Sequence, residues 1–144
     1  MYFAGMLAAF CAGLFAGAAA YITFVEQPVR LRDTPAIALT EWRPRYPRAA
    51  GMQASLAVVG TLGGLARWWE GGGLGWLSGS LLLGAVVPIT LVVILPTNRQ
   101  LFDPSLASAA PEAKQLLGRW GRLHPIRTGL SLAAFVLFLA LLAR

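Results

Sequence analysis

Between Val86 and Arg127 the chain reads VVPITLVVILPTNRQLFDPSLASAAPEAKQLLGRWGRLHPIR, and this stretch is the most informative part of the sequence. It begins within a membrane-length apolar run, continues through a basic loop, and ends at the start of another apolar run. Asn98, Trp120 and His124 therefore lie where two membrane helices should meet the same water interface. Polar side chains at that depth are costly unless they are paired or used. The ends of these helices are thus the first place to look for a functional site.

The composition predicts an integral membrane protein with one domain. The chain has 144 residues, of which 57% are hydrophobic and 12% charged, whereas soluble domains carry roughly 25% charged residues. A soluble chain of this length could not bury so much apolar surface in one core. The single cysteine, Cys11, excludes an intramolecular disulfide.

Four apolar runs predict an all-α membrane protein whose four transmembrane helices form an up-down bundle. A span needs about 20 apolar residues, and the candidate spans cover approximately residues 2–25, 49–66, 74–95 and 126–143 of a single domain, 1–144. The first run could be mistaken for a signal peptide, but no basic residue precedes it. Pro88 should kink the third span.

Small residues recur every four positions on the first three spans, which lets helix backbones approach closely in lipid. They predict packing within the bundle, with a homo-oligomer through the same faces as the alternative. A short interfacial helix is expected between spans three and four. It starts at Pro111 and has an apolar stripe made of Ala113, Leu116, Leu117 and Trp120.

The basic residues predict the orientation in the membrane. Of the 12 Lys and Arg residues, ten lie in or beside the two long loops, and Arg67 and Arg144 lie on the other side. The positive-inside rule then places both long loops in the cytoplasm and both termini outside, in a bacterial inner membrane. Because topology and anionic lipid explain this charge, the net charge of +6 does not indicate a nucleic-acid partner. Membrane lipid and a lipophilic small molecule are the expected partners.

The up-down topology brings ten polar or aromatic residues to one side of the bundle. Trp120, His124 and Arg127 are spaced by four and three residues, which puts them on one helix face. The other candidates are Tyr21, Glu26, Arg30, Trp42, Tyr46, Arg48 and Asn98. Each also has a structural explanation, such as binding lipid phosphate, capping a helix or forming an aromatic belt.

No metal site or cofactor is expected. One histidine, with Glu26 the nearest plausible second ligand, falls short of the usual set of three protein ligands. The sequence contains neither a phosphate-binding loop nor a dinucleotide-binding fingerprint.

Several of these motifs together resemble the DUF1772 family, the anthrone oxygenase-like membrane proteins. The resemblance covers nearly the whole chain and is carried by Glu26-Gln27-Pro28-Val29-Arg30, the stretch from Trp42 to Arg48, Pro96-Thr97-Asn98 with Leu101, and Trp120 with His124 and Arg127. It implies a four-helix membrane bundle. A few fungal members are associated with the oxidation of anthrones to anthraquinones, without flavin or haem.

Two functions follow from these observations. The first is a cofactor-independent oxygenase that acts on a lipophilic aromatic or quinone-type compound, with His124 as base and Arg127 or Arg48 stabilising an oxyanion. In this hypothesis Asn98 hydrogen-bonds a carbonyl, and Glu26 orients His124 or an arginine. The remaining candidates, which would bind the substrate, are Trp42, Tyr46, Trp120, Arg30 and Tyr21. The alternative is a non-enzymatic membrane protein that binds lipid or quinone, or a small subunit of a membrane complex.

Overall fold

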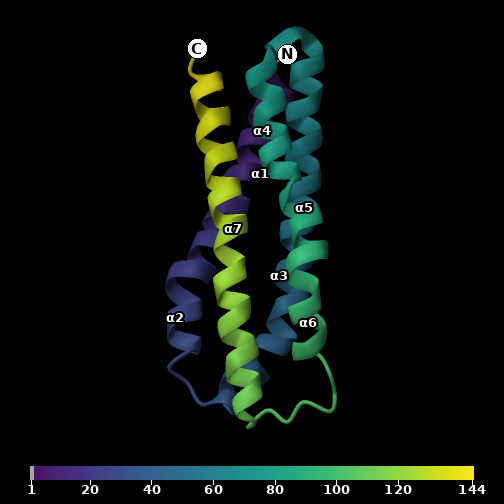
Figure 1. Cartoon of the computed structure of the whole chain (residues 1–144). Coiled ribbons are helices and arrows are strands. Elements are labelled where there is room, and N and C mark those ends of the chain that lie inside the picture. The colour runs from purple at the N-terminus through teal and green to yellow at the C-terminus, as the bar shows by residue number, and fades with distance from the viewer. Residues whose placement is uncertain (1) are drawn as a thin grey trace.

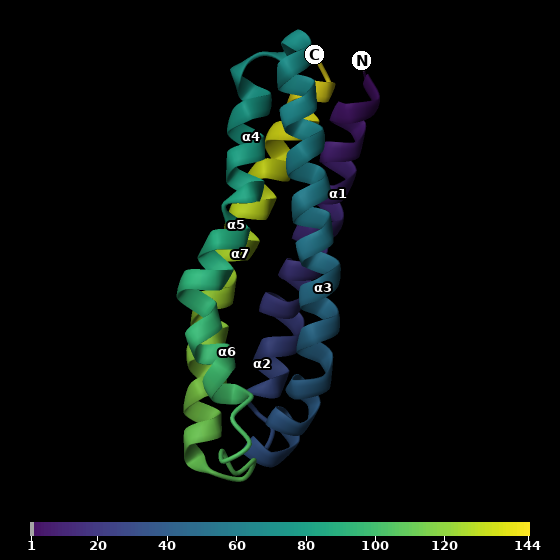
Figure 2. The ribbon, with the colours of Figure 1, turned by 90° about the vertical axis from the view of Figure 1, so that its right-hand side faces the viewer.

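A computed structural model describes residues 2–144, with the side chain of Tyr2 excepted, and folds the chain into four antiparallel helical rods (Figures 1 and 2). The described residues contain no β-strand, and each rod is long and apolar enough to cross a membrane. This confirms the predicted all-α membrane fold with four helices. The rods are α1 (Tyr2–Tyr21) with η1 (Ile22–Glu26) and α2 (Gln27–Arg30); α3 (Pro35–Arg67) with η2 (Trp68–Gly72); α4 (Leu74–Gly84) with α5 (Val86–Ile89), η3 (Thr90–Ile94) and α6 (Leu95–Leu101); and α7 (Pro111–Leu142).

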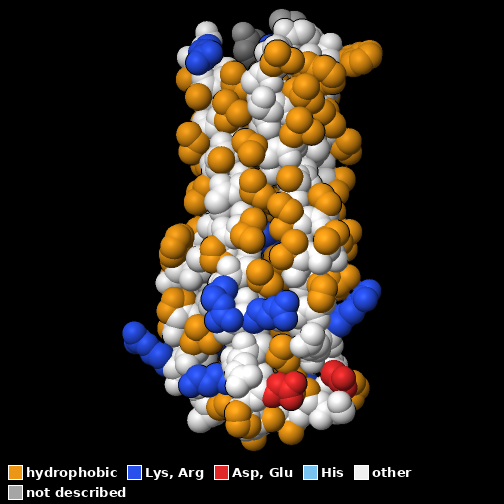
Figure 3. Space-filling view, viewed as in Figure 1, with side chains coloured by type: hydrophobic (Ala, Val, Ile, Leu, Met, Phe, Trp, Pro, Cys, Tyr) orange, Lys and Arg blue, Asp and Glu red, His pale blue; other side chains and the backbone are white. Residues whose placement is uncertain are grey.

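The two ends of the bundle differ in what they contain. Both termini and the turn between α3 and α4 lie at one end, here called the terminal end (Figure 1). The connections 31–34 and 102–110 lie at the other, here called the loop end. Gly71 and Gly73 both have φ of +88° in the turn at the terminal end, a conformation that favours glycine. On the face shown in Figure 3, Lys and Arg side chains form a band near the loop end, and most of the remaining surface is hydrophobic or uncharged.

Close helix packing holds the terminal end together. Phe138 of α7 stacks on Trp76 of α4, with ring centroids 5.3 Å apart. Gly64 and Gly79 both face the Phe138 ring, and a Cβ at either position would overlap with neighbouring side chains. The small residues of the second and third spans thus bring these helices against α7 within one chain.

The helices extend well beyond the apolar runs that predicted them. α3 begins at Pro35 rather than near residue 49, because Thr34 caps it and Pro35 occupies its first position. It continues through Pro44 and Pro47. The residues expected to be a loop before the second span are therefore helical, and they extend the bundle toward the loop end.

The expected short helix between the third and fourth spans is not a separate element, because Pro111 begins α7 and the helix continues without interruption into the fourth span. Its apolar stripe does not lie on the surface either. Ala113, Leu117 and Trp120 are buried against Trp42 and Leu101. The stripe therefore forms a second hydrophobic core, which closes the loop end of the bundle.

The third rod changes direction around α5 (Figure 2). α4 ends at Gly84, two residues before α5 begins, and the π-helical turn η3 follows Pro88. Proline lacks the N–H that would continue the helical hydrogen bonds. The Thr90 hydroxyl donates to the Val86 carbonyl oxygen at 2.6 Å, and the Thr90 N–H donates to the same oxygen.

Candidate functional site

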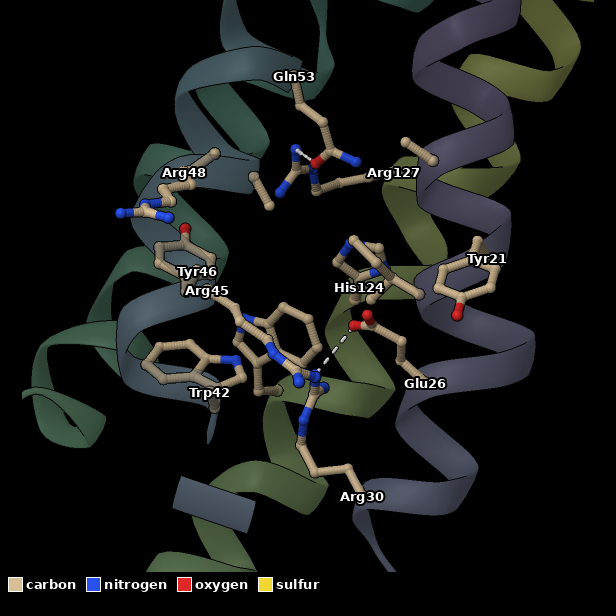
Figure 4. A pocket seen from close by; sticks show the side chains of 15 residues that line it. Tyr21, Glu26, Arg30, Trp42, Arg45, Tyr46, Arg48, Gln53, His124 and Arg127 are labelled. Carbon is tan, nitrogen blue, oxygen red and sulfur yellow. Dashed lines mark hydrogen bonds and ion pairs between the residues drawn. The ribbon is translucent and has the colours of Figure 1, made fainter. Parts of the chain in front are cut away.

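A cavity of about 390 Å³ lies toward the loop end, between the first rod and α3, with α7 behind it (Figure 4). Nine of the ten side chains predicted to form a site line it. They are Tyr21, Glu26, Arg30, Trp42, Tyr46, Arg48, Trp120, His124 and Arg127. The cavity is also lined by Ala18, Ile22, Arg45, Ala49, Ala50 and Gln53.

Three lining residues come from one face of α7, as their spacing predicted. Trp120, His124 and Arg127 are all buried, and the helix continues through Pro125 between them. A proline inside a helix removes one hydrogen bond, but the face of the helix persists across it. α7 therefore supplies the back wall of the cavity.

Aromatic rings form the wall nearest the loop end. Trp42 and Tyr46 stack with centroids 4.7 Å apart, and the edge of Trp120 meets them at 5.9 and 6.2 Å. The His124 ring lies 4.8 Å from Trp120. Such a wall offers flat faces and edges to another aromatic ring.

Asn98 lies behind this wall rather than on it. Its side-chain amide donates a hydrogen bond from α6 to the Tyr46 hydroxyl oxygen. In this structure Asn98 therefore acts on the cavity through Tyr46. Since the Tyr46 oxygen accepts that bond, its own hydrogen remains to be donated.

His124 is 1% exposed and its two ring nitrogens have different surroundings. Nδ1 lies 3.0 Å from the Thr23 hydroxyl oxygen of η1. Nε2 is buried and has no hydrogen-bond partner among residues 2–144. Glu26 pairs with Arg30 at 3.1 Å, so of the two orienting roles predicted for Glu26, the structure shows the contact with an arginine.

The charged side chains give the cavity an excess of positive charge. Four arginines line it, at positions 30, 45, 48 and 127, against the single carboxylate of Glu26. Arg45 pairs with Glu41 at 3.3 Å. An excess of one sign in a low-dielectric cleft attracts ligands of the other sign, so the cavity favours an anionic ligand.

Arg127 is the most deeply placed of these charges. It is 4% exposed, donates to Gln53 Oε1 at 2.7 Å and lies 5.4 Å above the Phe15 ring. No carboxylate within the described part of the chain pairs with it. A buried guanidinium without a counter-ion is costly, and an anionic ligand would remove that cost.

Several polar atoms of the cavity residues have no hydrogen-bond partner among the described residues. Nε1 of Trp42, Nε1 of Trp120, Nε2 of Gln53 and Nε of Arg127 are buried donors that have no acceptor within the described residues. A buried polar group without a partner costs about 1–3 kcal/mol. The residues around the cavity therefore hold hydrogen-bonding capacity that the described part of the chain does not use.

Gln53 and Thr23 were not predicted from the sequence. Gln53 is the one strongly polar side chain inside the second apolar run, and its depth in a membrane span is a signal of function. Thr23 gives a weaker signal, because threonine is common in membrane helices. Within the residues that the structure describes, no three His, Cys, Asp or Glu side chains lie together as a metal site would need.

Comparison with known proteins identifies relatives of this chain. The family model described as anthrone oxygenase matches residues 42–137. An anthrone oxygenase of Aspergillus fumigatus is 32% identical over 147 residues, which cover 94% of this chain and 88% of the relative. No solved structure matches the chain.

Proposed function

The chain belongs to the anthrone oxygenase family, and from this premise we propose that it is a membrane enzyme that oxidises a lipophilic anthrone- or quinone-type compound with molecular oxygen. One observation carries the proposal. His124, whose Nε2 has no hydrogen-bond partner among the described residues, lines an aromatic cavity whose arginines suit an oxygenated, anionic ring system. The relative from Aspergillus fumigatus is an anthrone oxygenase, which agrees with that substrate class.

The proposed reaction begins with proton removal. The CH₂ group of an anthrone is acidic because the resulting negative charge spreads through the rings to the carbonyl oxygen. His124 Nε2 takes this proton as general base, because a neutral imidazole nitrogen without a hydrogen carries a free lone pair. Arg127, which Gln53 holds in place, stabilises the oxyanion.

Oxygen then reacts with the carbanion without a further cofactor. The carbanion transfers electrons to O₂ and a C–O bond forms, which gives a hydroperoxide after protonation. Loss of the second proton from the same carbon breaks the O–O bond, forms C=O and releases water. The reaction thus consumes one O₂, retains one oxygen atom in the quinone and forms one water.

The other predicted residues take supporting roles in this proposal. Trp42, Tyr46 and Trp120 hold the flat ring system, and Tyr46 is held in turn by Asn98. Arg30, Arg48 and Tyr21 line the side of the cavity between the first rod and α3 (Figure 4). Substrate dissolved in the bilayer would enter there.

We also propose that the loop end faces the cytoplasm of a bacterial inner membrane. The ten basic residues in or beside the two loops support this sidedness through the positive-inside rule. Cysteine labelling of Ser108→Cys from outside intact cells tests it, with Glu70→Cys in the exposed turn between α3 and α4 as the matched site at the other end. Labelling of Ser108→Cys alone would reverse the proposed orientation.

Turnover in bilayers tests the enzymatic proposal. The protein, reconstituted in nanodiscs, is given an anthrone and ¹⁸O₂, and the quinone is analysed by mass spectrometry. We expect one ¹⁸O atom per quinone and a loss of about 10²–10⁴-fold in rate for His124→Ala. Ser78→Ala is the control, because its hydroxyl bonds only its own helix at Leu74. Full activity of His124→Ala would remove His124 from the reaction.

The same preparation tests the non-enzymatic alternative. Native mass spectrometry of protein extracted with minimal detergent identifies whatever occupies the cavity. An aromatic or quinone-type ligand supports the proposal. Stoichiometric phospholipid or a partner chain, together with absence of turnover, would instead favour a lipid-binding protein or a subunit of a complex.

A further inference from the structure

Two threonines connect His124 to the backbone of the first rod. His124 Nδ1 lies 3.0 Å from Thr23 Oγ1, and Thr23 Oγ1 lies 2.8 Å from Thr128 Oγ1. Thr128 Oγ1 in turn lies 3.2 Å from the carbonyl oxygen of Ala19. The four groups form a continuous chain of hydrogen bonds between α7 and the first rod.

The direction of every bond in this chain follows from its last member. A carbonyl oxygen only accepts, so the Thr128 hydroxyl donates its one hydrogen to Ala19. The Thr128 oxygen must then accept from Thr23, which uses the one hydrogen of Thr23. The Thr23 oxygen is left as an acceptor, and therefore the hydrogen between it and His124 belongs to Nδ1.

We propose that Thr23 and Thr128 are positioning residues that hold neutral His124 with its proton on Nδ1 and keep the lone pair on Nε2. An unrestrained neutral histidine carries its proton mainly on Nε2. In that tautomer Nε2 has no free lone pair and could not accept a proton from a substrate. The chain of threonines therefore selects the less common tautomer. That Nε2 acts as the base rests on the proposed function, whereas the tautomer itself does not.

The helices arrange this chain in an unusual way. A threonine hydroxyl in a membrane helix commonly donates to the carbonyl four residues earlier, which for Thr23 would be Ala19. Here Thr128 of α7 donates to that carbonyl instead, so the Thr23 hydrogen is directed to Thr128. Thr23 also lies in the π-helical turn η1, a type of irregularity found frequently at functional sites.

Nuclear magnetic resonance can read this tautomer directly, because the chain contains one histidine. Protein labelled with ¹⁵N-histidine and reconstituted in bilayers gives signals from His124 alone. At a pH where the ring is neutral, we expect Nδ1 to show the shift and the N–H coupling of a protonated nitrogen and Nε2 the shift of an unprotonated one. The reverse assignment in the unaltered protein would overturn the inference, and this measurement needs no variant.

Substitutions then test which residues hold the proton in place. Thr23→Val removes the acceptor of Nδ1–H, so we expect the proton to move to Nε2 and the two nitrogen signals to exchange positions. Thr23→Ser keeps the hydroxyl and should keep the original spectrum. Thr61→Val is the matched control, because it removes a buried hydroxyl of α3 that has no partner among the described residues. An unchanged spectrum in Thr23→Val would overturn the role of Thr23.

Thr128→Val tests the second link. Without Thr128, the Thr23 hydroxyl can turn to the Ala19 carbonyl or to Nδ1, so we expect both tautomers to be populated. A spectrum identical to that of the unaltered protein would remove Thr128 from the proposal. Turnover measured beside these spectra separates the two claims. If the expected tautomer is seen without turnover, this inference stands and the proposed function is contradicted. If turnover is seen with the opposite tautomer, the oxidation stands and this inference is contradicted.

Discussion

Replacing Arg127 with glutamine is expected to raise the pKa of a phenol bound in the cavity. The guanidinium is buried and no carboxylate among residues 2–144 pairs with it, so its charge acts on whatever fills the cavity. Glutamine is chosen because its amide retains a donor for Gln53, which accepts from Arg127 at 2.7 Å. The substitution therefore removes the charge and keeps a hydrogen-bonding side chain at this position.

The size of the cavity determines how large this change in the pKa of the bound phenol should be. A sphere of about 390 Å³ has a radius of roughly 4.5 Å, so a bound oxygen lies ~5 Å from a charge on the wall. With an effective dielectric constant of about 20, a unit charge at that distance contributes about 3 kcal/mol. This corresponds to roughly 2 pKa units of the bound phenol. We expect Arg127→Gln to raise its pKa by that amount and Arg127→Lys to change it much less.

Absorbance of a bound dye measures this pKa. A hydroxyanthraquinone absorbs at longer wavelength as phenolate than as phenol, so a pH titration of the protein–dye complex in nanodiscs gives the pKa of the bound form. Arg48→Gln is the control, because Arg48 is an exposed lining residue and solvent screens its charge. If dye bound to Arg127→Gln titrates as it does in the unaltered protein, the buried charge does not act on the ring and the reasoning is refuted.

Two further substitutions have defined outcomes. Gly121→Ala should lower the free energy of unfolding by about 1–3 kcal/mol through overpacking, because its Cβ would overlap Gln27, which donates to Leu117 at 2.8 Å. The melting temperature in nanodiscs should fall accordingly, and an unchanged melting curve would contradict this. The N–H and O–H of Ser105 donate to one carboxylate oxygen of Asp103 and hold the pKa of that carboxyl below its usual range. The ionised carboxylate therefore stabilises the turn at any pH above the usual pKa of aspartate. This stabilisation is lost as the pH falls through the lowered pKa of Asp103. Ser105→Ala should move the pKa of Asp103 back up toward its usual value in a ¹³C NMR titration, and a pKa that stays in place would show that the hydroxyl contributes nothing.

The fold was predictable because lipid restricts a chain to few solutions. Four apolar runs with short or basic connections can form little other than an up-down bundle. The spacing of Trp120, His124 and Arg127 was sufficient to place them on one face of α7. The start of α3 was also readable, since Thr34 followed by Pro35 is a helix-start signature. The prediction instead began the second span where its apolar run begins, near residue 49.

The detailed contacts of the site could not be predicted, because they depend on how each helix is rotated. The pair of Glu26 with Arg30 is the exception, because the two residues lie four positions apart within one rod. The position of Asn98 behind Tyr46 depends on the bend of the third rod around α5. The bond from Thr128 to Ala19 crosses between helices and leaves no pattern in the sequence.

The third rod, although it is one of the four that cross the membrane, supplies no lining residue to the 390 Å³ cavity. It also contains the break at α5 and the turn η3. Helices respond to a bilayer that is thinner or thicker than their apolar length by tilting or bending. A bend that develops in this rod would reach the cavity through its contacts behind the aromatic wall, such as the hydrogen bond from Asn98 to Tyr46. The break at α5 thus gives the bundle a place to adapt to membranes of different thickness that lies outside the lining of the cavity.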